Sequence, residues 1–139
     1  MPLYPMIDDR PTESSKDNDA PLWNTYNNRS AWKLYLGKLF EKGDTPYYAA
    51  PARATDLTNL PPTITYVGDL DPFLSETVTY AENLGKAGVP AEYRVYKGCF
   101  HGFDVLYPDA KVSKEALDWF HSSVAKAADT YFKPQGKSS

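Results

Sequence analysis

The chain has 139 residues, of which 42% are hydrophobic and 24% charged, and its net charge at neutral pH is −3. These values are typical of one globular domain, and the scattered basic residues argue against a nucleic-acid-binding surface. The single cysteine, Cys99, excludes an intrachain disulfide and a multi-cysteine metal site. With no signal peptide and no apolar stretch of roughly 20 residues, we expect a soluble cytoplasmic protein with no membrane span, metal or cofactor.

The first half of the chain contains one predicted strand and one predicted helix. Residues 3–7 are a short apolar run, which predicts a strand that starts without any lead-in. Residues 11–21 are polar and flanked by prolines, so they predict a loop. Apolar residues recur at steps of three and four between positions 30 and 40, which predicts a helix, with Gly43 just beyond its end. A second loop is expected at 44–62.

The second half alternates strands and helices. The predicted elements are a strand at 63–67, a helix at 72–86, a strand at 93–96 and a last helix starting at 113. Asp71 is a natural N-cap for the first of these helices, with Pro72 at its first position, where the missing N–H costs nothing. Ser113 is the expected N-cap of the last helix. The polar tail, residues 133–139, is expected to be disordered.

This order of elements predicts an α/β fold. Strand–helix–strand units of this length favour parallel pairing with right-handed crossovers, which gives a parallel sheet of about three strands. Such a sheet is narrow, because parallel sheets are normally wider and covered on both faces. We therefore expect the chain to be part of a larger fold.

Two loops follow the predicted strands and carry the candidate functional residues. Asp71 lies in the loop after the strand at 63–67, and His101 lies in the loop after the strand at 93–96. Functional residues of open α/β sheets gather at the carboxyl ends of the strands, so one interpretation of the two residues is an acid–imidazole pair. The spacing alone leaves open that Asp71 is only an N-cap and His101 only a loop histidine.

Other candidates near these loops carry weaker arguments. Asp69 competes with Asp71 for the role of the acid, although Asp71 is preferred because it lies at the helix start. The thiol of Cys99 matches no cysteine-enzyme motif and is expected to be a small loop or core thiol. His121 falls within the last predicted helix and is expected to have a surface or packing role. Glu76 is expected to brace the loop or the helix start.

Several motifs in order make the chain resemble the C-terminal half of hormone-sensitive-lipase-type carboxylesterases. They are Leu60-Pro61-Pro62-Thr63, Gly68-Asp69-Leu70-Asp71-Pro72-Phe73, Glu76, Tyr80-Ala81, Ala87-Gly88-Val89-Pro90 and His101-Gly102-Phe103, with Leu3-Tyr4-Pro5, Trp32, Tyr35-Leu36-Gly37 and Ala50-Pro51-Ala52 upstream. The resemblance implies a partial α/β-hydrolase and a carboxylic ester hydrolase (esterase or lipase) of the serine type. It assigns the acid of a catalytic triad to Asp71 and the general base to His101. Trp32 and Tyr35 resemble cap residues that line an acyl pocket, or they only pack their helix onto the sheet.

The resemblance also divides the chain. Residues 1–10 and 60–132 correspond to the C-terminal part of the hydrolase core. Residues 11–59 correspond to a cap-like helical insertion and its return loop.

The nucleophile that the resemblance calls for has no counterpart in the sequence. None of the nine serines lies in a G-x-S-x-G motif, and no HGGG-type oxyanion segment is present. We therefore expect a truncated hydrolase that is inactive in isolation, and that acts on a small acyl ester only when complemented by an N-terminal partner chain. An unpaired sheet edge also predicts a homo-oligomer. The alternatives are a non-catalytic interaction module derived from the fold, or one half of a split hydrolase.

Overall fold

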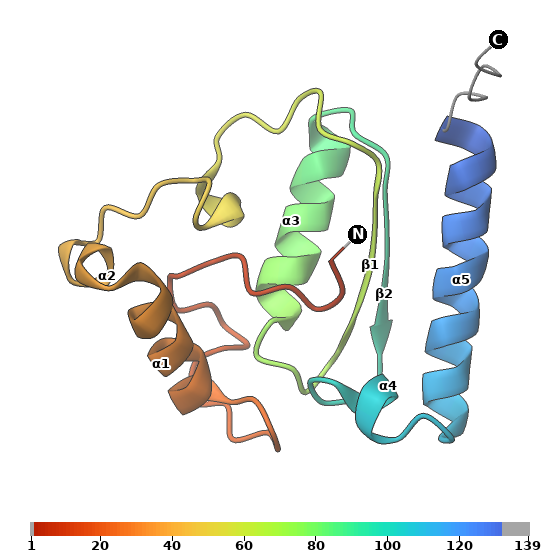
Figure 1. Ribbon diagram of the computed structural model, residues 1–139, viewed down its shortest axis with the longest axis horizontal. Coiled ribbons are helices and arrows are strands. Elements are labelled where there is room, and N and C mark those ends of the chain that lie inside the picture. The colour runs from red at the N-terminus through yellow and green to blue at the C-terminus, as the bar shows by residue number, and fades with distance from the viewer. Residues whose placement is uncertain (1, 132–139) are drawn as a thin grey trace, which may run out of the picture.

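The computed structural model describes residues 2–131, so the predicted tail at 133–139 lies outside the described residues. The elements are α1 (Thr25–Leu36), α2 (Lys38–Lys42), the 3-10 turn η1 (Pro51–Arg53), β1 (Thr63–Gly68), α3 (Leu74–Lys86), β2 (Ala91–Tyr96), α4 (Phe103–Leu106) and α5 (Lys111–Tyr131). The two strands lie between α3 on one side and α5 on the other (Figure 1). This layered arrangement confirms the predicted α/β class.

The sheet is a parallel pair. β1 and β2 run in register from Thr63 opposite Ala91 to Gly68 opposite Tyr96. β1 is buried along nearly its whole length, as expected for a continuous apolar strand that is covered on both faces. β2 is exposed through most of its length, because its charged residues lie at the edge of the sheet.

The predicted strand at residues 3–7 is wrong, and among the described residues the sheet has two strands instead of about three. One main-chain bond, from Tyr4 N to Tyr66 O (3.0 Å), links this segment to β1. Pro5 has no N–H to donate to a ladder, and Tyr4 has a φ of 35°, which is incompatible with an extended strand. The segment therefore runs beside β1 without joining the sheet.

The helix starts also differ from the sequence prediction. α3 begins at Leu74, because residues 71–73 form a turn in which Leu74 N donates to Asp71 O at 3.1 Å. α5 begins at Lys111, so Ser113 is not an N-cap; it is buried within the first turn and its hydroxyl donates to Phe103 O at 3.4 Å. The helix predicted at 30–40 is divided into α1 and α2 at Gly37, whose φ of 54° and ψ of −124° are not helical.

The core is divided into three clusters. The cluster between the sheet and α5 contains Tyr66, Tyr96, Cys99, Phe103 and Ala116, and the cluster beneath α3 contains Leu57, Leu84 and Val89. A third cluster, of Trp32, Leu36 and Ala50, lies within residues 11–59. None of the helices in the described part of the chain is long and apolar enough to cross a membrane.

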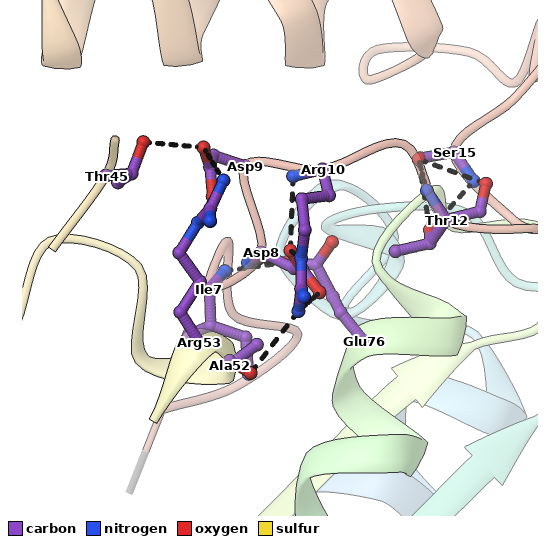
Figure 2. Close-up of polar contacts among 10 residues, drawn as sticks. All are labelled: Ile7, Asp8, Asp9, Arg10, Thr12, Ser15, Thr45, Ala52, Arg53 and Glu76. Atoms are coloured by element: carbon purple, nitrogen blue, oxygen red, sulfur yellow. Dashed lines mark hydrogen bonds and ion pairs between the residues drawn. The ribbon is translucent and has the colours of Figure 1, made fainter. Parts of the chain in front are cut away.

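The N-terminal segment is attached to α3 by a buried carboxyl group (Figure 2). Glu76 Oε1 accepts hydrogen bonds from Ile7 N at 2.6 Å and Asp8 N at 3.1 Å. Its other oxygen, Oε2, is buried and has no hydrogen-bond partner within residues 2–131. Burial raises the pKa of Glu76 to about 8, although the two backbone donors act to lower it. Glu76 thus braces residues 7–8, and not the loop or the helix start as the sequence suggested.

The same segment is tied to residues 11–59 by an ion pair. Asp9 accepts two hydrogen bonds from Arg53, at 2.6 and 3.0 Å, and one from the hydroxyl of Thr45 at 2.7 Å (Figure 2). Burial acts to raise the pKa of Asp9, but the hydrogen bonds from Arg53 and Thr45 outweigh it and the pKa is lowered. Asp9 is therefore a carboxylate that joins the N-terminal segment to the loop after α2.

Candidate active site

The two loops at the carboxyl ends of β1 and β2 are in direct backbone contact. A Cβ atom on Gly68 would lie 2.0 Å from Cys99 O, so only glycine allows this approach. Past the end of the strands, Asp69 N donates to Tyr96 O and Leu70 N donates to Cys99 O, both at 3.0 Å. The two loops are thus held together by the main chain before any side chain contributes.

Asp71 and His101, the acid and the imidazole singled out from the sequence, are hydrogen-bonded to each other. The distance from His101 Nδ1 to Asp71 Oδ2 is 2.9 Å. The second carboxylate oxygen of Asp71 accepts the backbone N–H of Phe73, also at 2.9 Å. The side chain of Asp71 is 0% exposed, whereas that of His101 is 21% exposed. The acid is therefore fixed inside the protein, and the imidazole lies between it and the solvent.

Three aromatic rings surround the imidazole of His101. The ring centroids of Tyr4, Phe73 and Trp23 lie 4.7, 5.2 and 5.6 Å from that of His101. Tyr4 and Phe73 meet the imidazole nearly edge-to-face, with interplanar angles of 73° and 77°. These three rings come from separate segments of the chain, and together they restrict the tilt of the His101 imidazole.

The arrangement is capable of general-base chemistry. A carboxylate at Nδ1 selects the tautomer in which Nδ1 carries the proton, which leaves Nε2 with a free lone pair. The same carboxylate stabilises the imidazolium that forms when Nε2 takes up a proton. Such a pair needs a hydroxyl or thiol to activate, and within residues 2–131 no serine hydroxyl is hydrogen-bonded to His101.

The other candidates near the loops have different environments. Asp69 Oδ1 accepts the N–H of Gly98 at 2.7 Å, so it closes the turn before His101 and does not contact the imidazole. Cys99 is buried, and this burial, followed by the charges of Asp69 and Asp104, raises the pKa of its thiol. It is therefore a neutral thiol, as expected for a packing residue. His121 is exposed on α5.

Trp32 and Tyr35, the two proposed pocket residues, have unequal surroundings. Trp32 is 2% exposed and packs with Leu36 and Ala50. It also lines a cavity of about 450 Å³ between α1 and residues 9–17. Tyr35 is 61% exposed, and its ring lies 5.9 Å from that of Trp32. Neither belongs to the set of rings around His101.

The sequence did not single out the three aromatic rings around His101, or Asp104, the second acidic residue near it. Phe73 and Tyr4 lie within motifs of the family resemblance, but no spacing rule places them beside residue 101. Trp23 lies in a polar loop without periodicity. Asp104 follows His101 by three residues, and it accepts hydrogen bonds from Tyr4 and Tyr66. The only indication that the sequence offers for Asp104 is an acidic residue three positions after a histidine, in a segment that contains glycines.

A fold of this class is found in known proteins. The model of the family described as alpha/beta hydrolase fold matches residues 1–105, and the chain belongs to this family. Within residues 2–131, no group of three or more His, Cys, Asp or Glu side chains could hold a metal ion.

Relatives with esterase names confirm the resemblance noted in the sequence. The structure of a bacterial heroin esterase is 43% identical with a TM-score of 0.76, over 82% of this chain and 37% of that one. The esterase LipW from Mycobacterium marinum is 32% identical with a TM-score of 0.82, over 90% and 39%. Esterase LipI of Mycobacterium tuberculosis is 31% identical over 89 residues, which are 64% of this chain and 28% of LipI. The chain thus spans well under half the length of these relatives.

Proposed function

We propose that the chain carries the acid and the general base of a serine-type carboxylic ester hydrolase. The observation that carries this proposal is the 2.9 Å hydrogen bond between the buried Asp71 carboxylate and the part-exposed His101 imidazole. Membership of the alpha/beta hydrolase family and the similarity to named esterases support it. In this role Asp71 orients the imidazole and stabilises its protonated form, and His101 removes a proton from the attacking serine.

The serine itself is proposed to come from outside these 139 residues. None of the nine serines lies in a G-x-S-x-G motif. Ser14 and Ser75 lie close to the turn at Pro72, but their hydroxyls bond to the main chain: Ser14 Oγ to Pro72 O and to Ser75 N, and Ser75 Oγ to Ser14 N. The segment that contributes the serine must also contribute the backbone amides of an oxyanion hole.

The test is reconstitution with a short-chain p-nitrophenyl ester as substrate. The chain alone is expected to hydrolyse the ester at the rate of buffer. When it is mixed with a polypeptide that carries the part of an esterase relative not matched by this chain, activity is expected to appear. His101→Ala or Asp71→Asn should then reduce this activity by about 10³-fold or more, whereas His121→Ala should leave it unchanged. Activity of the chain alone, or of a reconstituted His101→Ala variant, would contradict the proposal.

The cap-like residues are proposed to contribute to binding of the acyl group. Trp32 supports this role because it lines the cavity of about 450 Å³, and the exposed Tyr35 lies beside it. In the reconstituted enzyme, Tyr35→Ala should raise the KM for a longer acyl chain with little effect on kcat. An equal KM for variant and wild type would limit Tyr35 to surface packing.

The alternative function is a non-catalytic interaction module or one half of a split hydrolase. The largely unpaired edge of β1 favours it. Within the described residues, β1 pairs with β2 on one side, whereas its other side has one main-chain hydrogen bond, from Tyr4. Such an edge is proposed to pair with a second copy or with an N-terminal partner chain. Light scattering at high concentration tests this pairing. A homo-oligomer is expected, and a strict monomer would rule out pairing with a second copy and leave pairing with a partner chain.

The proposed location is the cytoplasm. The single free thiol, Cys99, is compatible with it.

A further inference from the structure

A second buried carboxylate lies close to the His101 loop. Asp104 is 4% exposed. Its Oδ1 accepts the hydroxyl of Tyr4 at 3.2 Å, and its Oδ2 accepts the hydroxyl of Tyr66 at 2.6 Å. Within residues 2–131 it forms no ion pair. A buried carboxyl group with two hydroxyl donors and no cation is costly to retain, so it calls for an explanation beyond packing.

Tyr4 connects this carboxylate to the imidazole. Its ring centroid is the nearest of the three around His101, at 4.7 Å, and its hydroxyl donates to Asp104. Its backbone N–H donates to Tyr66 O at 3.0 Å. Tyr4 is thus held at its main chain and at the tip of its side chain, in a left-handed conformation (φ 35°) that residues other than glycine rarely adopt.

We propose that Tyr4 is a positioning residue for His101, and that Asp104 and Tyr66 act through it by fixing the plane and depth of its ring. The catalytic meaning of this proposal rests on the proposed function, in which His101 is the general base. The hydrogen bond that His101 Nδ1 donates to Asp71 fixes one nitrogen of the imidazole, but a single bond leaves the ring free to tilt about it. Tyr4 limits that tilt, so that Nε2 keeps one direction.

The chemistry of the two tyrosines supports a permanent restraint. Burial, followed by the charge and hydrogen bond of Asp104, raises the pKa of Tyr4 to about 12. The pKa of Tyr66 is raised as well, first by burial and then by the hydrogen bond to Asp104. Both hydroxyls therefore remain donors over the pH range in which an imidazole can accept a proton.

The experiment uses NMR on the full chain, in which His101 and His121 are the only histidines. The observable is the imidazole Nδ1–H proton of His101 and its rate of exchange with water. Asp71→Ala identifies the signal by removing its acceptor. The exposed His121 is the internal reference, and far-UV circular dichroism verifies that each variant is folded.

Two variants of Tyr4 distinguish the effect of its ring from the effect of its hydroxyl. Tyr4→Phe keeps the ring and removes the hydroxyl, while Tyr4→Leu removes both. Because an aromatic pair contributes a modest free energy, we expect exchange of the His101 proton to be about 2- to 10-fold faster in Tyr4→Leu, with Tyr4→Phe between it and the wild type. Tyr48→Phe is the matched control on an exposed tyrosine and should have no effect on this exchange rate.

The outcomes are distinct. An unchanged exchange rate in folded Tyr4→Leu overturns the proposal, and Tyr4→Phe decides alone if the leucine variant does not fold. Equal acceleration at His101 and at backbone amides throughout α5 would also overturn it, because it would indicate a general loss of stability.

If reconstituted hydrolysis fails while the His101 proton responds, the proposed function falls and the positioning role of Tyr4 stands. If hydrolysis succeeds with no response at His101, only the positioning role falls.

Discussion

The strand-end region, residues 68–73 and 98–103, and the cap-like region, residues 11–59, are held together in different ways. In the strand-end region, backbone groups of the two loops bond to each other directly, and Asp71 is completely buried. The cap-like region depends on the side chain of Trp32, while large apolar residues such as Leu34 and Tyr48 are 86% and 78% exposed. The first region is thus sensitive to backbone geometry, and the second to the loss of single side chains.

The sharpest test of this difference is the close contact at Gly68. Gly68→Ala places a methyl group 2.0 Å from a main-chain oxygen that cannot rotate away, so we expect a loss of more than about 4 kcal/mol in the free energy of unfolding. Gly85→Ala, in the last turn of α3 where a methyl group meets open space, should stabilise the chain by about 0.5 kcal/mol. Urea denaturation measures both. A cost below 1 kcal/mol at Gly68 would show that the loops are not rigidly joined.

The cap-like region is tested at Trp32. Trp32→Ala removes a side chain that is 2% exposed and should cost about 3 kcal/mol if this region unfolds together with the sheet. The neighbouring Tyr35→Ala should cost less than about 0.5 kcal/mol, because its side chain is mostly exposed. If Trp32→Ala instead produces a separate early transition, the two regions are independent units.

Glu76 lies outside both regions and joins residues 7–8 to α3, and its effect depends on pH. Since burial raises its pKa to about 8, the unfolded chain loses this proton near the ordinary glutamate pKa of 4.5 while the folded chain retains it. Stability should therefore fall as pH rises between these values, by about 1.4 kcal/mol per pH unit, or about 2 kcal/mol from pH 6 to 7.5. Glu76→Gln should remove this slope. Parallel pH profiles of wild type and variant would show that Glu76 is ionised in the fold.

The smallest effects concern ion pairs. Arg53→Met breaks two hydrogen bonds to Asp9, whose side chain is 5% exposed, and should cost about 1.5 kcal/mol at neutral pH. Because the pKa of Asp9 is lowered in the fold, this contribution is present above the ordinary pKa of an aspartate and is lost at lower pH. Lys126→Met, at a pair with Glu92 that is exposed on both sides, should change stability by less than about 0.5 kcal/mol. Equal costs for the two variants would mean that burial of Asp9 adds nothing.

The sequence was informative where local chemistry determines the structure. β1, β2 and the two loops were predictable because β-branched and aromatic runs end at glycines, and the proximity of Asp71 and His101 follows from parallel strands. The path of residues 3–7 was not predictable from an apolar run, because Pro5 and the left-handed Tyr4 prevent pairing. Nor could spacing reveal the contacts of Tyr4 with Asp104, since the two residues are 100 positions apart. The partner of Glu76 was missed for the same reason.

The backbone bonds that continue past the ends of β1 and β2 have a consequence for the lifetime of the acid–imidazole pair. Asp69 N and Leu70 N donate to Tyr96 O and Cys99 O, so the amides just before Asp71 and the carbonyls before His101 belong to the same hydrogen-bonded unit as the sheet. Amides of such units exchange with deuterium through large, cooperative openings and not through local fraying. Asp71 and His101 would then separate about as rarely as the strands themselves, and the pair would be among the last features lost on gradual denaturation.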